Sequence, residues 1–197
     1  MARTMTEAKK TAILSAAQKA FATRDFHEVL TDDIAANAGI GKATLYRYFG
    51  TKEDLYFAAL VGAFGELDRV LESALPREPS PEARLAVIAR EVLRIFWNRR
   101  AFYTLRHPDA RSFGSQERTL QLRREKVVRS IEQTLRAGIQ RGAFHFTDAR
   151  GGAELFMGMV RATLFYRRDA GSPGELAKDI VAVFLHGVSR AAPVGVR

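Results

Sequence analysis

The side chains best suited to chemistry in this sequence gather between residues 42 and 52. Their members are cationic, hydroxyl-bearing or small: Lys42, Ala43, Thr44, Tyr46, Arg47, Tyr48 and Lys52. Ammonium, guanidinium and hydroxyl groups donate hydrogen bonds to phosphate oxygens and to acceptors on base edges, which is how proteins hold and read a nucleic acid. Such a short run of donors predicts a DNA-binding surface.

The rest of the sequence offers no rival constellation for catalysis or metal binding. It has no cysteine, and its histidines are scattered without i, i+3 or i, i+4 pairing: His27, His107, His145 and His186. A serine-centred nucleophile elbow, a phosphate-cradling glycine loop and an HExxH pair are all missing from the sequence. We therefore expect no enzymatic activity, no cofactor and no metal.

Two short helices at a sharp turn would present the DNA-binding side chains, and residues 31–55 predict that arrangement. The inward positions are apolar: Ile34, Ala35, Ala38, Ile40, Leu45 and Phe49. Gly39 supplies the left-handed residue of the turn. Thr31 is expected to cap the first helix and to leave its free backbone N–H groups for phosphate. The segment thus predicts a helix-turn-helix with a recognition helix at 42–48. The alternative is a structural hairpin whose tyrosines only pack.

Residues 13–60 resemble the TetR family of bacterial transcription regulators. The family's pattern is a threonine, an Ile-Ala pair, a glycine turn, Leu-Tyr-x-x-Phe and a lysine that opens the next helix, and this sequence matches it at Thr31, Ile34-Ala35, Gly39, Leu45-Tyr46, Phe49 and Lys52. Gly41 stands where the family often has serine, and Tyr48 where histidine is frequent, so Tyr48 is assigned only as DNA-facing.

The resemblance implies a DNA-binding domain at 1–52 and a ligand-binding and dimerisation domain at 53–197. It further implies a homodimer through the last two helices, with two recognition helices about 34–36 Å apart on a palindromic operator. A small-molecule effector, binding the two states unequally, would move the fourth helix as a lever and relieve repression. Activation instead of repression stays open.

The remaining sequence is typical of an all-α fold with about nine helices. Helical periodicity and breakers predict helices near 6–22, 31–38, 42–48, 52–75, 81–98, 99–107, 115–141, 149–168 and 173–190. Capping-box spacing recurs at Thr51 to Asp54 and at Ser172 to Glu175, and Ser80 precedes Pro81 as a cap.

The second domain is rich in aromatic residues and methionine, and the resemblance to a ligand-responsive family suggests that some of them line an effector pocket. The expected pocket residues are Trp97, Tyr103, Phe156, Met159, Arg161 and Thr163. Arg161 lies in the apolar run LFMGMVRATLFY, so it must reach the surface, pair, or meet an anionic ligand. An acidic or acyl-type effector is the resulting hypothesis.

Charge and hydropathy place limits on partners and location. The net charge is +9 and the pI about 10.2, but most of the positive excess lies outside residues 1–52, so overall basicity does not support the helix-turn-helix. A nonspecific architectural DNA-binding protein is therefore the alternative function. No stretch of about 18 residues is free of charge, which predicts a cytoplasmic protein without a membrane span.

Overall fold

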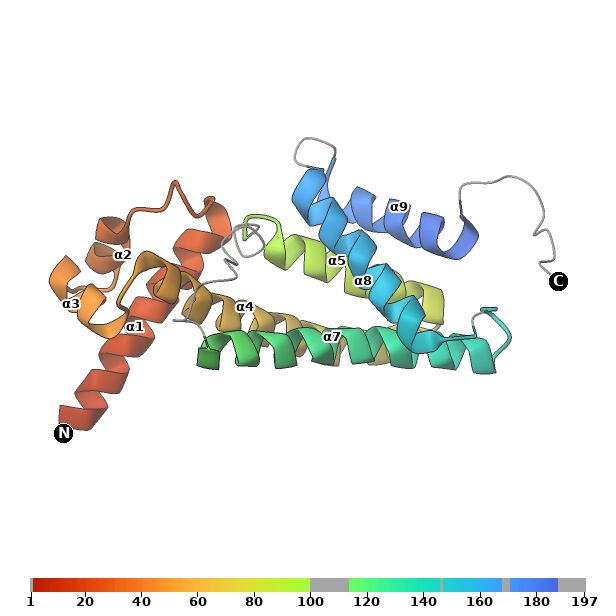
Figure 1. Ribbon diagram of the computed structural model, residues 1–197, viewed down its shortest axis with the longest axis horizontal. Helices are drawn as coiled ribbons and strands as arrows, with labels where there is room; N and C mark the ends of the chain where they lie inside the picture. Colours follow the sequence, from red (N-terminus) through yellow and green to blue (C-terminus); the bar gives the residue numbers. More distant parts are fainter. Residues whose placement is uncertain (1, 100–113, 146, 168–170, 188–197) are drawn as a thin grey trace. The chain divides into compact units, whose positions relative to one another are not determined.

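The computed structural model describes residues 2–99, 114–145, 147–167 and 171–187, and its regular structure there is entirely helical (Figure 1). The elements are α1 (Ala2–Thr23), α2 (Thr31–Asn37), α3 (Lys42–Tyr48), α4 (Lys52–Ala74), a 3-10 turn (Leu75–Arg77), α5 (Pro81–Phe96), α7 (Gly114–Gln140), α8 (Ala149–Tyr166) and α9 (Pro173–His186). The all-α prediction is confirmed, with eight α-helices in the described ranges. The helix expected near 99–107 lies almost entirely outside them.

Three helices begin at the caps that the sequence predicts. The Thr51 hydroxyl accepts the Asp54 backbone N–H at 3.0 Å, and Asp54 accepts the Thr51 N–H at 3.0 Å. Ser80 Oγ accepts the Ala83 N–H at 3.1 Å, with Pro81 as the first helical residue of α5. Ser172 and Glu175 form a complete capping box at α9. Each cap satisfies backbone donors that a helix start would otherwise leave unpaired.

The cap expected at Thr31 is wrong. Leu30 occupies the N-cap of α2 in an extended conformation, without a side-chain cap, and Thr31 is the first helical residue. Thr31 is only 8% exposed, and its hydroxyl bonds to a partner on another helix instead of to its own backbone. That partner is the Tyr46 hydroxyl of α3.

The chain forms two compact units: residues 1–70 with 95–127, and residues 71–94 with 128–197. Helices α4, α5 and α7 contribute residues to both. The domain boundary expected between residues 52 and 53 stays a prediction.

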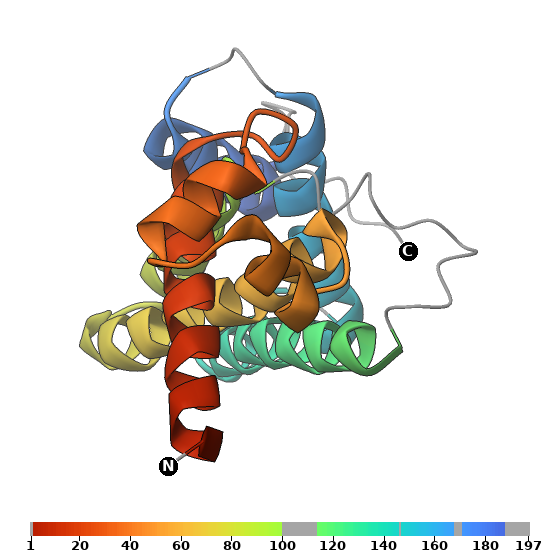
Figure 2. The same ribbon diagram turned by 90° about the vertical axis from the view of Figure 1, so that its left-hand side faces the viewer.

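In the first unit, aromatic packing fixes the start of α4 against α1. The buried rings of Phe21 and Phe26 both meet the Tyr56 ring edge-on, with centroids 4.9 and 5.1 Å apart. The Tyr56 hydroxyl donates to the Arg99 carbonyl oxygen at 2.6 Å, which satisfies its polar end. Helix α2 contacts both α1 and α3, and Figure 2 shows α1 in red beside these two short orange helices.

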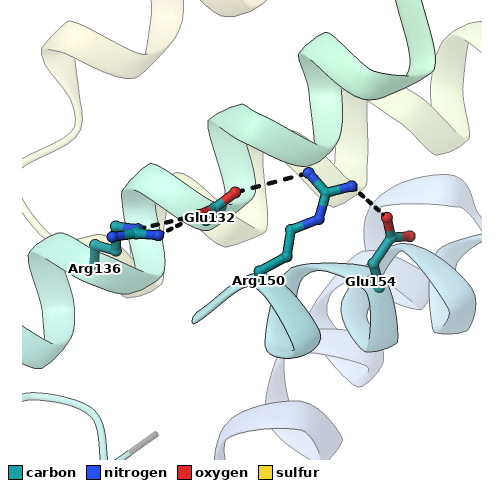
Figure 3. A network of polar contacts seen from close by, with 4 residues as sticks. All are labelled: Glu132, Arg136, Arg150 and Glu154. Atoms are coloured by element: carbon teal, nitrogen blue, oxygen red, sulfur yellow. Dashed lines mark hydrogen bonds and ion pairs between the residues drawn. The ribbon is translucent and has the colours of Figure 1, made fainter. Parts of the chain in front are cut away.

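In the second unit, α8 packs on α9 and is joined to α7 by charged groups. Phe156 is fully buried and meets the Phe184 ring edge-on at 5.1 Å. Arg150 lies between two glutamates, 3.7 Å from Glu132 of α7 and 2.8 Å from Glu154 of α8 (Figure 3). Glu132 also accepts from Arg136 at 2.6 Å, so four side chains form one network.

Among the described helices, none has both the length and the apolar character that crossing a bilayer requires. The described residues likewise contain no group of three or more side chains that would hold a metal ion.

Candidate nucleic-acid interface

The helix-turn-helix is built as the sequence predicts. Gly39 has φ +67°, the left-handed conformation that lets the chain turn sharply between α2 and α3. Ile34 and Leu45 are fully buried and Phe49 is 5% exposed, so both short helices are anchored from inside. Because these apolar positions face inward, the intervening residues of α3 face outward.

The outward residues of α3 include most of the predicted DNA contacts. Lys42, Ala43 and Arg47 are exposed, and the side chains of Thr44, Tyr46 and Tyr48 are half-buried. The exposed set carries two cations on a helix of seven residues. A side chain with an extended reach and no role in the core is what base and phosphate contacts need, and these residues therefore stay the predicted DNA-reading set.

Thr31 and Tyr46 form a hydrogen bond across the two helices. The two hydroxyl oxygens are 3.0 Å apart, and either of them can donate. This bond is the partner of the buried Thr31 hydroxyl, and it fixes the phenol of Tyr46 against the first residue of α2. Because this bond occupies the hydroxyl, the predicted phosphate contact of Thr31 would fall to its backbone N–H, beside Tyr46.

Two ion pairs tie cations to the first turn of α2, one from α3 and one from the segment between α1 and α2. Lys42 Nζ lies 3.0 Å from Asp32 Oδ2, and Arg24 Nη1 lies 3.1 Å from Asp33 Oδ2. The hydrogen bond to Asp32, together with its negative charge, raises the pKa of Lys42 above its ordinary value. Lys42 is therefore held as a cation at the start of α3.

Lys52, the first residue of α4, lies against an aromatic face. Its Nζ is 4.5 Å from the centroid of the Phe26 ring. Partial burial lowers the pKa of Lys52, because removing water from an ammonium disfavours its charged form. A ring face attracts a cation without neutralising it, so the ammonium keeps its attraction for phosphate.

The predicted pocket residues are brought together only in part. Phe156, Met159 and Thr163 share one side of α8 at helical spacing, and the Thr163 hydroxyl donates to the Met159 carbonyl oxygen at 3.0 Å. Arg161 is exposed on a different side of that helix. Trp97 is half-buried in the other compact unit, and Tyr103 lies outside the described residues. These six assignments stay predictions.

Two residues beside the interface hold its lysines without any signal in the sequence. The sequence pattern assigns neither Asp32 nor Phe26 to the interface, yet Asp32 pairs with Lys42 and the Phe26 ring lies under Lys52. The paired residues are ten and twenty-six positions apart along the chain, so no local spacing signals either contact.

Two sequence profiles match the chain at these elements. Residues 13–59 match the profile described as bacterial regulatory proteins, tetR family, and residues 78–188 match the tetracyclin repressor-like C-terminal domain. The second match alone covers more than half of the chain. The chain belongs to the TetR family. A family of regulatory proteins agrees with the expectation that this member is not an enzyme.

Individual TetR-family proteins match it as well. The HTH-type transcriptional regulator EthR of Mycolicibacterium smegmatis (strain ATCC 700084 / mc(2)155) is 29% identical over 131 residues, 66% of this chain and 53% of EthR. The chain thus spans about half the length of that curated relative.

Solved structures share the fold. The transcriptional regulator FadR from Bacillus subtilis, in complex with stearoyl-CoA, has a TM-score of 0.70 at 18% identity, covering 91% of this chain and all of FadR. AibR, in complex with isovaleryl coenzyme A and operator DNA, has a TM-score of 0.64 at 24% identity and covers 91% of this chain and 98% of AibR. At these identities the likeness concerns the fold alone.

Proposed function

We propose that this TetR-family chain is a sequence-specific transcriptional repressor that leaves its operator when a small molecule binds. The observation that carries the proposal is the outward face of α3, where Lys42 and Arg47 are exposed on a helix anchored by the buried Leu45. A short helix with an apolar inner side and a donor-rich outer side suits the major groove, where each base pair presents a distinct pattern of acceptors and donors.

A homodimer through α8 and α9 belongs to the same proposal. Leu155 of α8 is 64% exposed and Val183 of α9 is 42% exposed, so these helices keep apolar surface beyond what their mutual packing buries. A second copy would cover that surface and place two α3 helices about one duplex turn apart, ~34–36 Å. The operator of such a dimer is an inverted repeat.

The proposed effector is an anionic acyl compound. FadR holds stearoyl-CoA and AibR holds isovaleryl coenzyme A, and these thioesters combine an apolar chain with negative charge. Phe156 and Met159 on α8 supply apolar side chains to contact the acyl chain of such a ligand. Arg161 is exposed on another side of α8 from these two residues, so it would not contact the acyl chain. It would pair only with the negatively charged part of the ligand.

The test is fluorescence-anisotropy binding to the DNA that flanks the gene, against a shuffled duplex of the same composition at near-physiological salt. Repressor function predicts a clear preference for the native duplex, abolished or strongly reduced in Arg47→Ala. If neither the flanking DNA nor duplexes selected from random sequence are preferred, the protein is a nonspecific architectural DNA-binding protein, whose affinity falls steeply with salt.

The effector is tested on the same complex. Stearoyl-CoA and isovaleryl-CoA are titrated into the preformed complex with native DNA, with free coenzyme A as the control for charge alone. Release by a thioester but not by coenzyme A supports the acyl class. If neither thioester releases the DNA, these two ligands are excluded as effectors, and the DNA-binding part of the proposal is unaffected.

A further inference from the structure

The proposed DNA-reading surface contains one carboxylate in contact with one of its own cations. Asp32, on the first turn of α2, accepts a hydrogen bond from Lys42, the first residue of α3, at 3.0 Å. The side chains are 61% and 55% exposed, so both stand at the surface. A negative charge there opposes the approach of any polyanion, whatever its sequence.

The contact changes what Lys42 can offer to DNA. An ammonium paired with a carboxylate is already neutralised, so it adds little to the release of counterions from phosphates, which drives nonspecific binding. It still has three N–H donors, of which Asp32 uses one. The remaining donors are held in place and can meet an acceptor on a base edge, such as guanine O6 or N7.

Asp33, the neighbouring acid, provides the comparison. Its carboxylate pairs at 3.1 Å with Arg24, the residue that follows α1, and not with a residue of α3. Both acids stand in the first turn of α2, where either stabilises the positive end of the helix dipole. Only Asp32 combines that place with a bond to a predicted DNA-contacting residue.

We propose that Asp32 is a specificity-determining residue of the DNA-reading surface. By holding Lys42, it weakens the attraction of this lysine for the phosphates of arbitrary DNA and reserves the ammonium for an acceptor at one position of the operator. The inference rests on the proposed function, in which α3 reads an operator. An acceptor on a base edge needs only one of the two donors that Asp32 does not use, so reading the operator leaves the ion pair intact.

The experiment compares Asp32→Asn with Asp33→Asn in the full-length protein. Each removes one negative charge from the first turn of α2, but only Asp32→Asn releases Lys42. The probes are the operator duplex, obtained from the flanking DNA or by selection from random duplexes, and a shuffled duplex. Dissociation constants are measured across a salt series, and circular dichroism checks that each variant is folded.

We expect Asp32→Asn to bind the shuffled duplex about tenfold more tightly, with a salt dependence steeper by the equivalent of about one phosphate contact. Its affinity for the operator should rise much less. The ratio of the two affinities therefore falls. Asp33→Asn should change the affinities for both duplexes by a similar factor, so that the ratio of operator to shuffled affinity stays the same. With Lys42→Gln in the background, Asp32→Asn should no longer change the ratio.

An unchanged ratio in Asp32→Asn, or a change that persists without Lys42, overturns this inference while the operator preference of the wild-type protein leaves the proposed function intact. A wild-type protein without preference for any selected duplex overturns both.

Discussion

The two cations Arg47 and Lys52 occupy different settings at the proposed interface. Arg47 is exposed near the end of α3, where its fork of donors can reach a base edge. Lys52 lies over the Phe26 ring at the start of α4, beside the recognition helix and not on it. From these settings we propose base reading for the arginine and phosphate binding for the lysine.

This assignment predicts different responses to truncation. Arg47→Ala should cost about 1–3 kcal/mol on the operator and much less on shuffled DNA, because base contacts are lost. Lys52→Ala should weaken both duplexes by a similar factor and reduce the salt slope by about one. Anisotropy titrations at several salt concentrations measure both effects. Arg141→Ala, an exposed arginine just beyond α7, is the control. Equal losses from both variants on both duplexes would contradict the assignment.

The sequence predicts which of these residues face outward, but not what they touch. Leu45 and Phe49 are correctly predicted to face inward, because the period of 3.6 residues determines sides of a helix. The contacts of Asp32 with Lys42 and of Thr31 with Tyr46 depend on how α2 crosses α3. Periodicity along one helix contains no information about a crossing angle, so these pairs become visible only in three dimensions.

At the scale of elements, Asp68 joins α4 to α7 within the first compact unit. Its carboxylate is 7% exposed, accepts from Arg123 at 2.6 Å and lies 3.2 Å from the Lys126 ammonium. The two cations are much more exposed than the acid, at 39% and 45%. Water can therefore rehydrate either cation if the acid is removed, whereas the acid cannot be rehydrated if both cations are removed.

The expected stabilities follow from this asymmetry. The double variant Arg123→Met with Lys126→Met should lower the free energy of unfolding by about 3 kcal/mol, because it leaves the buried Asp68 carboxylate without an opposite charge. Asp68→Asn should cost about 1 kcal/mol, since it removes the charge itself. Urea unfolding followed by circular dichroism provides the comparison, with Arg129→Met, at an exposed site on α7, as the control. A larger loss from Asp68→Asn than from the double variant would refute the explanation.

The capping box of α9 should make a pH-dependent contribution to the free energy of unfolding. The Glu175 carboxylate accepts the Ser172 backbone N–H at 2.9 Å and its hydroxyl at 2.9 Å, and these bonds, the backbone one first, lower the pKa of Glu175. A carboxyl whose pKa is lower in the folded protein stabilises it above the unfolded pKa, and this contribution disappears as the pH falls through the folded pKa.

Glu175→Gln should therefore be less stable than the wild-type protein at pH 7, and the difference should vanish below the lowered pKa of Glu175. Ser172→Ala should cost about 1 kcal/mol even at low pH, because the cap of the helix itself is lost, and its cost should rise towards pH 7, where the Glu175 carboxylate also loses the Ser172 hydroxyl. Urea unfolding at a series of pH values measures both. Asp179→Asn, an exposed acid on α9 outside the box, is the control. If Glu175→Gln differed from the wild-type protein in free energy of unfolding by the same amount at every pH, the charge of Glu175 would not be the cause.

Local signals explain why these element boundaries were predictable. Each successful cap joins residues three positions apart, at Thr51, Ser80 and Ser172. Thr31 had the right residue type for a cap but is buried against α3, where Tyr46 offers its hydroxyl a partner. A tertiary contact thus replaced a local one, which residue type alone does not reveal.

For the whole molecule, the exposed apolar side chains of α8 and α9 are the feature that a single chain does not explain. They are Leu155, Phe165, Tyr166 and Val183, and Tyr166 is 77% exposed. Large apolar side chains left exposed on two helices that pack together suggest that another molecule covers them. The proposed homodimer covers these residues with the same helices of a second copy, as a two-fold axis requires.

The double variant Leu155→Glu with Val183→Glu should be monomeric, because a dimer would bury four carboxylates at its interface. It should also bind the operator at least ~100-fold more weakly, since each half-site is then bound without the help of the other. Light scattering after size exclusion measures the mass, and anisotropy measures the affinity. Leu122→Glu makes the same substitution at a leucine of α7 that is 61% exposed, and it should leave both unchanged. A folded double variant that stays dimeric would place the interface elsewhere, whereas a monomer with full operator affinity would show that one copy suffices to read the DNA.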